Sequence, residues 1–322
     1  MTWRLLALPP LPAQVLQKAF GDPRVELVLP SERTQAAVDV LLPTVDLVVG
    51  DWTRTLRIDD PGPRVCLVQM PSVGVDVVDL DRCAARGVPV ANCAGANTTS
   101  VAEWCLGATL ALLRKTVQAD SAVRRGEWPQ TQLGGRELAG SRVGVVGMGS
   151  IGRRVAELFA AMGCEVAYWS RSRHEDAPGS YAELDELIAT SDVLVTVIAL
   201  SPQTRGLVGA ELLARAKPGL LLVNAGRGGL VDEPAVLEAL GSGQLAGAAL
   251  DVFAAEPLPP GSPLRGAAGV LLSPHTAGST VQASARIIGQ TRANVQRALA
   301  GEAVHDVVNG QPSRVMRRHG PR

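Results

Sequence analysis

A glycine-rich turn between a strand pattern and a helix pattern limits the possible folds of this chain more than any other feature. Glycines 147, 149 and 152 form a G-x-G-x-x-G sequence between the β-branched run 142–146 and the amphipathic helical stretch 150–163. In that context the first glycine permits a tight turn, the second lets the backbone approach a pyrophosphate, and the third lets the helix pack on the strand. The sequence therefore predicts a dinucleotide site, with an ordinary glycine-rich loop as the alternative. Its expected residues are Gly147, Gly149, Ser150, Ile151 and Gly152.

Short apolar runs alternate with helical patterns along the whole chain, which predicts parallel sheets built from βαβ units. The runs are almost continuously hydrophobic, as strands covered on both faces must be. The 322 residues suffice for two domains. We therefore expect an α/β fold with doubly wound parallel sheets. The expected strands are 3–8, 25–30, 46–50, 64–70, 88–92, 142–147, 165–170, 192–200, 219–226, 245–253 and 269–275, and the main helices are 101–126, 150–163 and 281–301.

Composition disfavours several classes of function. The 31 basic and 31 acidic residues cancel, so the chain lacks the positive charge of a nucleic-acid binder or a membrane-surface protein. Five scattered cysteines without a Cys-x-x-Cys pair argue against a disulfide framework or a zinc site and fit a reducing compartment. No apolar run reaches the ~20 residues that span a bilayer, and early prolines interrupt the N-terminal apolar stretch, unlike a signal peptide. We expect a cytoplasmic protein with no metal, nucleic-acid or membrane partner.

The end of the second strand in the dinucleotide unit selects the cofactor. An acidic residue there binds the ribose 2′-hydroxyl of NAD, whereas an arginine accommodates the 2′-phosphate of NADP. This strand ends in Ser170, Arg171 and Ser172, without a carboxylate. The Arg171 guanidinium can bind a phosphate in a forked geometry, and the two hydroxyls can add hydrogen bonds. The sequence predicts NADP as the cofactor, with NAD as the second choice; a purely solvent-facing arginine is the alternative.

Three polar residues follow three expected strands, at the edge where α/β sheets carry their chemistry. They are Arg227, Glu256 and His275. A guanidinium can bind a carboxylate and polarise a neighbouring ketone, and an imidazole can donate or accept a proton. A carboxylate beside the imidazole orients it and favours its charged form. Each residue alone could be structural, but together beside a dinucleotide turn they predict a catalytic set.

Several motifs around these residues resemble the D-isomer-specific 2-hydroxyacid dehydrogenases, a family that includes glyoxylate and hydroxypyruvate reductases. The motifs are VGVDVVDLDRCAARGVPVAN, TTSVAEWCLGATLALLR, VNAGRGGLVDE, LDVFAAEP and SPHTAG. The resemblance implies hydride transfer between NAD(P)H and a small 2-keto or 2-hydroxy acid, with His275 as general acid or base. It also implies that the N–H groups of Val73 and Gly74 and the Arg227 side chain bind the substrate. The residues it places at the nicotinamide end are Thr98, Ala225, Gly226, Asp251 and Gly278.

The same resemblance implies two Rossmann-like domains, with the cofactor domain inserted into a discontinuous substrate domain. The expected bounds are 1–96 with 286–322 for the substrate domain and 97–285 for the cofactor domain. The two crossings would act as hinges that close over the substrate. The long helix after Ser100 is similar to the arm through which family members form homodimers.

Two other functions stay open on the sequence. The family includes corepressor-like proteins that sense a dinucleotide without turnover, and the same scaffold carries formate and phosphite dehydrogenases. The first sixty residues resemble the family least, although they would shape the pocket for the substrate side chain. Trp52, after the strand 46–50, is either a wall of that pocket or a packed aromatic residue.

Overall fold

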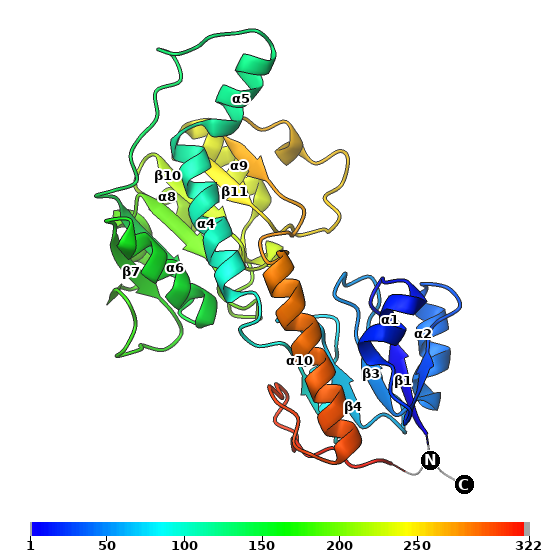
Figure 1. Ribbon diagram of the computed structural model, residues 1–322. Coiled ribbons are helices and arrows are strands. Elements are labelled where there is room, and N and C mark those ends of the chain that lie inside the picture. The colour runs from blue at the N-terminus through cyan, green and yellow to red at the C-terminus, as the bar shows by residue number, and fades with distance from the viewer. Residues whose placement is uncertain (1, 319–322) are drawn as a thin grey trace. The chain divides into compact units, whose positions relative to one another are not determined.

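The computed structural model describes residues 2–318. The chain folds into two compact units (Figure 1). The inserted unit is Thr98–Thr280, and the first unit combines the residues up to Asn97 with those from Val281 onward. The sequence placed the second crossing between 285 and 286. Helix α10 (Val281–Ala300) runs through that position without a break, so the chain enters the first unit where the helix begins.

The inserted unit is built on a seven-stranded sheet whose neighbouring strands are all parallel. The strand order is β12-β11-β10-β9-β6-β7-β8, so the winding direction reverses between β6 and β9. Doubly wound sheets bind ligands at such a reversal, beyond the carboxyl ends of the strands. The strands are β6 (Arg142–Val146), β7 (Glu165–Trp169), β8 (Ser180–Tyr181), β9 (Val193–Thr196), β10 (Leu220–Asn224), β11 (Leu245–Leu250) and β12 (Val270–Leu272).

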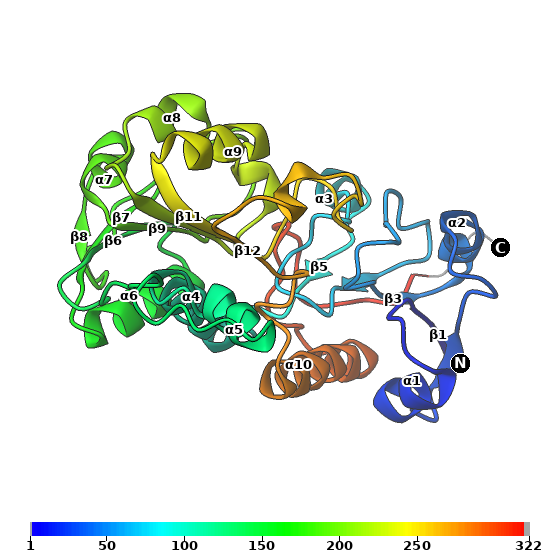
Figure 2. The same cartoon turned by 90° about the horizontal axis from the view of Figure 1, so that it is seen from above.

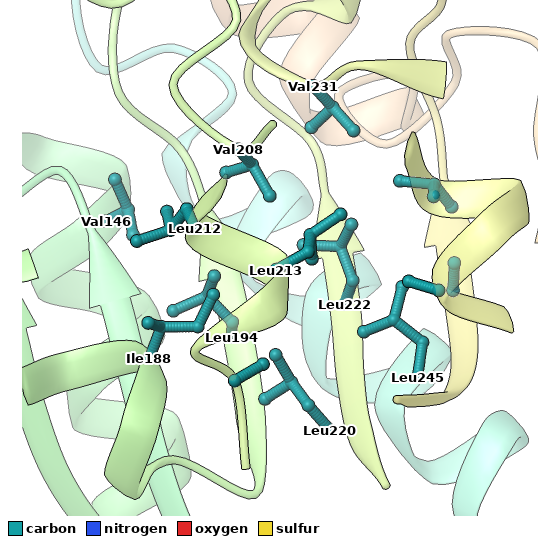
Figure 3. Packing of buried hydrophobic residues seen from close by; sticks show 14 of the residues in the cluster. Val146, Ile188, Leu194, Val208, Leu212, Leu213, Leu220, Leu222, Val231 and Leu245 are labelled. Atoms are coloured by element: carbon teal, nitrogen blue, oxygen red, sulfur yellow. The ribbon is translucent and has the colours of Figure 1, made fainter. Parts of the chain in front are cut away.

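Helices cover both faces of this sheet (Figure 2). On one face lie α4 (Thr98–Leu113) and α6 (Ser150–Ala161), and on the other lie α7 (Leu184–Thr190), α8 (Ala210–Ala214) and α9 (Glu233–Ser242). Apolar side chains of the strands pack against the second set of helices in the core of Figure 3. A separate core fills the opposite face. The predicted doubly wound parallel sheet is confirmed.

The first unit carries a five-stranded parallel sheet of order β2-β1-β3-β4-β5. One core packs α1 and α10 against one face, and another packs α2 and α3 against the opposite face. The strands are β1 (Trp3–Ala7), β2 (Val25–Val28), β3 (Leu47–Val49), β4 (Leu67–Gln69) and β5 (Val90–Ala91). The other helices are α1 (Ala13–Phe20), α2 (Gln35–Leu41) and α3 (Leu80–Ala85), and short 3-10 turns occupy Leu42–Thr44 here and Gly228–Leu230 and Pro263–Arg265 in the inserted unit.

The prediction of one helix over 101–126 is wrong, because the structure has two helices there. Helix α4 ends at Leu113, and α5 (Thr116–Arg124) begins after Lys115, which has a left-handed backbone with φ 49°. The Leu113 carbonyl accepts a hydrogen bond from the N–H of Arg136 at 3.0 Å. A contact from a distant segment therefore replaces the next helical bond, and helical periodicity cannot reveal such a contact.

Gly228, which opens the 3-10 turn after β10, has no room for a side chain. An added Cβ would lie 1.9 Å from the carbonyl carbon of Phe253, on the segment after β11. Because backbone cannot move aside as a flexible side chain can, we expect Gly228→Ala to lower the free energy of unfolding by roughly 2 kcal/mol or more. Urea denaturation measures the loss. Gly261→Ala is the control, since its added Cβ would meet nothing within 4 Å, and equal stability of the two variants would contradict the expectation.

Candidate active site

The turn between β6 and α6 has the backbone that a pyrophosphate site requires. Gly147 has φ 105°, and an added Cβ would lie 2.7 Å from the backbone of Ile198. A Cβ on Gly152 would lie 1.9 Å from the carbonyl oxygen of Gly147. A Cβ on Gly149 would meet nothing within 4 Å. Packing therefore demands the first and third glycines, while the second leaves open space for a ligand.

The N-terminus of α6 faces this turn with unpaired donors. The N–H groups of Gly149, Ser150 and Ile151 meet no acceptor in residues 2–318. Unpaired N–H groups and the helix dipole together favour a phosphate at such a position. The chain thus fits a dinucleotide, which these residues would hold by its pyrophosphate.

The end of β7 carries the three residues that the sequence assigned to the 2′-phosphate. The buried Ser170 hydroxyl donates to the carbonyl of Ser172 at 2.6 Å. This bond closes the loop on itself, and the predicted role of Ser170 toward the cofactor stays a prediction. The side chains of Arg171 and Ser172 are exposed, and neither has a hydrogen-bond or ion-pair partner in the described part of the chain. Those two residues fit the role of phosphate ligands.

Two anchors that sequence reasoning missed hold the loop that carries Arg171. The Tyr168 hydroxyl donates to the carbonyl of His174 at 3.0 Å and accepts from its N–H at 2.9 Å. Arg153, on α6, donates from Nη2 to the Asp176 carboxylate at 2.7 Å and from Nη1 to its carbonyl at 3.0 Å. The side-chain bond from Arg153 holds the pKa of Asp176 below its usual range. A tyrosine within the apolar run 166–169 was the available signal, because a buried phenol needs a polar partner.

Glu256 and His275 form a hydrogen-bonded pair beyond the adjacent strands β11 and β12. Glu256 Oε2 lies 2.7 Å from His275 Nδ1, and Oε1 accepts from the N–H of Phe253 at 3.1 Å. The carboxylate thus fixes the ring and occupies Nδ1, so Nε2 is the nitrogen left for a substrate. The His275 side chain is 37% exposed, which makes the ring accessible to a small molecule.

Asp251 holds the loop that carries His275. Its buried carboxylate accepts from the N–H groups of Thr276 (2.7 Å) and Ala277 (2.9 Å) and from the Ser273 hydroxyl. Its carbonyl accepts from the His275 N–H at 2.8 Å. These bonds maintain His275 at φ 55°, a left-handed conformation that costs a non-glycine residue about 1 kcal/mol. The structure therefore gives Asp251 a positioning role, while its predicted place at the nicotinamide end of the cofactor stays a prediction.

Arg227 completes the set of three strand-end residues. It follows β10, which pairs with β11, so Arg227, Glu256 and His275 follow three neighbouring parallel strands. Arg227 Nη1 donates to the Gly226 carbonyl at 2.8 Å. Asn224 shapes the turn, because its side chain donates to the Arg227 carbonyl (3.1 Å) and accepts from the Gly226 N–H (3.2 Å). Sequence reasoning missed Asn224, although a polar residue at the end of an apolar strand was a signal.

Three further residues assigned to the nicotinamide end lie at element boundaries. Thr98 opens α4, and its buried hydroxyl has no partner among the described residues. The Ala225 N–H donates to the Thr196 carbonyl at 3.2 Å, and the Gly278 carbonyl accepts from the Thr280 N–H at 3.2 Å. Their roles toward the cofactor stay predictions.

In the first unit, the turn that follows β4 exposes donors only. The Val73 carbonyl accepts from Asn92 Nδ2 at 2.8 Å, and the Gly74 carbonyl accepts from the Ser72 hydroxyl at 2.6 Å. The N–H groups of Val73 and Gly74 meet no acceptor in the portion of the chain that is described. Two adjacent unpaired N–H groups suit an anion such as a carboxylate. Sequence reasoning missed Asn92, whose role depends on a contact between two loops, and Ser72, which bonds within its own turn.

Other kinds of site find no support. Across residues 2–318, no group of three His, Cys, Asp or Glu side chains could hold a metal ion, and every helix is too short or too polar to cross a membrane. The five cysteines are unpaired. Burial raises the pKa of the Cys66 thiol to about 12 and also raises the pKa of Cys105, which leaves both poor nucleophiles at neutral pH.

The fold and these features together define an α/β protein with an inserted dinucleotide-binding unit. The family model described as "D-isomer specific 2-hydroxyacid dehydrogenase, NAD binding domain" matches residues 106–277. The chain belongs to the D-isomer-specific 2-hydroxyacid dehydrogenases.

Known proteins of this family that resemble the chain differ in their substrates. It is 41% identical to D-3-phosphoglycerate dehydrogenase of Mycobacterium tuberculosis over 77% of its own length and 47% of the relative, so the chain spans about half the length of that relative. It is 38% identical to glyoxylate reductase of Aeropyrum pernix over 79% of each chain. The solved NADPH-dependent glyoxylate/hydroxypyruvate reductase of Sinorhizobium meliloti, in complex with NADP and malonate, superposes with a TM-score of 0.86 at 29% identity, covering 99% of this chain and 100% of that one.

Proposed function

We propose that the chain is an NADPH-dependent reductase of small 2-keto acids of the glyoxylate or hydroxypyruvate type. The observation that supports this most directly is the 2.7 Å contact between Glu256 and His275, on the sheet edge that also carries Arg227. The names of the Aeropyrum and Sinorhizobium relatives agree with this substrate class, whereas the name of the Mycobacterium relative implies a phosphorylated acid.

Each proposed residue has a chemical task in the reduction. When bound, the reduced nicotinamide supplies the hydride that the keto carbon accepts. The N–H groups of Val73 and Gly74 and the Arg227 guanidinium bind the substrate carboxylate, and Arg227 polarises the keto oxygen. His275 donates its Nε2 proton to that oxygen, which becomes the hydroxyl of the product. Glu256 orients the ring through its contact with Nδ1.

A turnover assay tests the proposal. The purified protein is mixed with NADPH or NADH and glyoxylate, pyruvate or hydroxypyruvate, and the loss of reduced-nicotinamide absorbance is followed. We expect consumption of NADPH that depends on the acid. Cofactor binding without turnover of any acid would instead indicate a dinucleotide sensor, and oxidation of formate or phosphite with NAD(P) would indicate the third function left open by the sequence.

Arg171 is expected to select NADPH over NADH. An exposed guanidinium at the 2′-phosphate contributes about 1.4 kcal/mol, because solvent weakens the charge-assisted bond. Arg171→Ala should therefore raise the Kd of NADPH ~10-fold and leave that of NADH unchanged, as measured by cofactor fluorescence. Arg173→Ala is the matched control, since the Arg173 guanidinium lies 4.3 Å from the centre of the Tyr181 ring. Unchanged NADPH affinity in Arg171→Ala would refute the NADP assignment.

We also propose a homodimer and a cytoplasmic location. Three apolar side chains around α5 are exposed, namely Val117 (54%), Val123 (53%) and Trp128 (76%), and such a group favours a protein interface. Trp128→Glu should convert a dimer to a monomer in light scattering, whereas Val40→Glu, at a valine on α2 that is 73% exposed, should not. A monomeric wild-type protein would contradict the proposal. The unpaired thiols support a reducing compartment.

A further inference from the structure

The turn that follows β4 directs two consecutive N–H groups toward the same side. The Ser72 carbonyl accepts from the Cys93 N–H at 2.9 Å, and the Val73 carbonyl accepts from Asn92 Nδ2 at 2.8 Å. Both peptide bonds are trans, and in a trans peptide the N–H points opposite to the carbonyl. The N–H groups of Val73 and Gly74 therefore both point away from the segment that follows the neighbouring strand β5.

The two carbonyls differ in what holds them. A main-chain donor holds the carbonyl of Ser72, whereas a single side chain holds that of Val73. The Ser72 hydroxyl bonds the next carbonyl, that of Gly74. Because glycine lacks the Cβ that restricts backbone rotation, the peptide between Val73 and Gly74 can turn over with little steric resistance. That rotation would replace the N–H of Gly74 with a carbonyl that repels anions, so the orientation of this peptide depends on Asn92.

Hydrogen bonds on both sides hold the main chain of Asn92 in place. Its N–H donates to the Asp306 carbonyl at 3.1 Å, and its carbonyl accepts from Gln69 Nε2 at 3.3 Å. The oxygen of the Gln69 side chain accepts from Asn294 Nδ2 at 2.7 Å, and both of these amides are buried. The segment after β5 is thus a fixed base, from which the Asn92 amide reaches the turn.

The Asn92 side chain makes a single hydrogen bond within the described part of the chain, although it is only 8% exposed. The Val73 carbonyl can only accept, so the atom at 2.8 Å from it is the donor Nδ2. The buried Oδ1 has no partner among residues 2–318. Asn224, Asn294 and Asn309, by contrast, use both their donor and their acceptor. Because an unpaired buried oxygen destabilises the fold, the Asn92 amide contributes through its bond to the turn alone.

We infer that Asn92 is a positioning residue for substrate binding, which fixes the direction of the Gly74 N–H through the Val73 carbonyl. The inference rests on the proposed function, in which these N–H groups bind the substrate carboxylate, and it adds a residue that does not itself touch the substrate. A hydrogen bond to a charged group contributes about 10- to 100-fold in affinity. Loss of the Gly74 donor should therefore weaken binding of the keto acid in the ground state and the transition state alike.

Steady-state kinetics with saturating NADPH test the inference. Asn92→Ala should raise the KM of glyoxylate or pyruvate ~10-fold or more and change kcat by less than about threefold, since the lost binding is uniform. Asn309→Ala is the matched control, because it removes two hydrogen bonds at the start of β5, to Val88 and Val90. An unchanged KM in Asn92→Ala, or an equal rise in Asn309→Ala, overturns the assignment.

Asn92→Asp provides a second variant, with a side chain of the same size. An ionised carboxylate cannot donate to the Val73 carbonyl, and it adds negative charge near the bound substrate carboxylate. The KM of Asn92→Asp should therefore exceed that of Asn92→Ala. A KM at or below the wild-type value overturns the inference.

Binding of oxamate, an unreactive analogue of pyruvate, separates this inference from the proposed function. The Kd of oxamate is measured for the NADPH complex by fluorescence titration, and we expect it to be ~10-fold higher in Asn92→Ala than in the wild type. The Kd of NADPH should be unchanged. If the wild type reduces no acid but shows this difference, the reductase function is wrong and the role of Asn92 in carboxylate binding stands. Equal oxamate affinity of the two proteins overturns the inference alone, because it leaves turnover by the wild type unaffected.

Discussion

His275→Ala is expected to lower kcat for keto-acid reduction by ~10²–10⁴, the usual contribution of a positioned general acid. The imidazole is accessible, and Glu256 holds its Nδ1 at 2.7 Å. Alanine removes the proton donor, so the developing alkoxide must take its proton from water. Single-turnover measurement of NADPH oxidation isolates this chemical step from product release.

NADPH affinity and two control variants distinguish the loss of the proton donor from a disrupted fold. The Kd of NADPH should change by less than about threefold, because the dinucleotide turn lies at β6, across the sheet from β12. His305→Ala, at an exposed histidine of the first unit, should keep full activity. The kcat of Glu256→Gln should lie between those of the wild type and His275→Ala, since glutamine keeps a hydrogen bond to the ring but removes the charge. Full activity of His275→Ala would exclude the proposed mechanism.

The sequence predicted the strand-end residues because parallel strands impose a simple geometry. A residue that follows an apolar run must lie at the carboxyl edge, and neighbouring strands bring such residues together. That reasoning located Arg227, Glu256 and His275 without any knowledge of distances. The dinucleotide turn was predictable for a similar reason, because a tight turn and close helix packing require glycine at 147 and 152.

Contacts between loops could not be predicted in this way. The bond from Asn92 to the Val73 carbonyl and the bonds from Arg153 to Asp176 join segments that no periodicity relates. The bond from the Ser170 hydroxyl to the carbonyl of Ser172 was equally hidden, because it depends on how the loop turns back on itself. Irregular segments follow from the sum of many such weak contacts, and a single sequence does not reveal which partners meet.

Asp251→Ala is expected to damage both stability and catalysis, and Asp192→Ala should damage stability alone. Alanine at 251 leaves two backbone N–H groups and the Ser273 hydroxyl without their acceptor at a position that is 1% exposed. Each unsatisfied buried donor costs about 1–3 kcal/mol, and water recovers part of that cost. We therefore expect the free energy of unfolding to fall by roughly 3 kcal/mol. In thermal unfolding that corresponds to a Tm lower by roughly 10 °C.

The catalytic loss follows from the strained position of His275. Without the bonds from Thr276 and Ala277 to Asp251, the left-handed backbone at His275 can relax and displace the imidazole. A misplacement of ~1 Å lowers a reaction rate about 10²-fold, so kcat should fall by about that factor well below the Tm. Asp192 provides the comparison, because its carboxylate likewise accepts from a backbone N–H, that of Arg142 at 2.9 Å, but before strand β9 rather than beyond its carboxyl end. If Asp251→Ala kept the kcat of Asp192→Ala in the folded protein, the carboxylate would stabilise the fold without positioning His275.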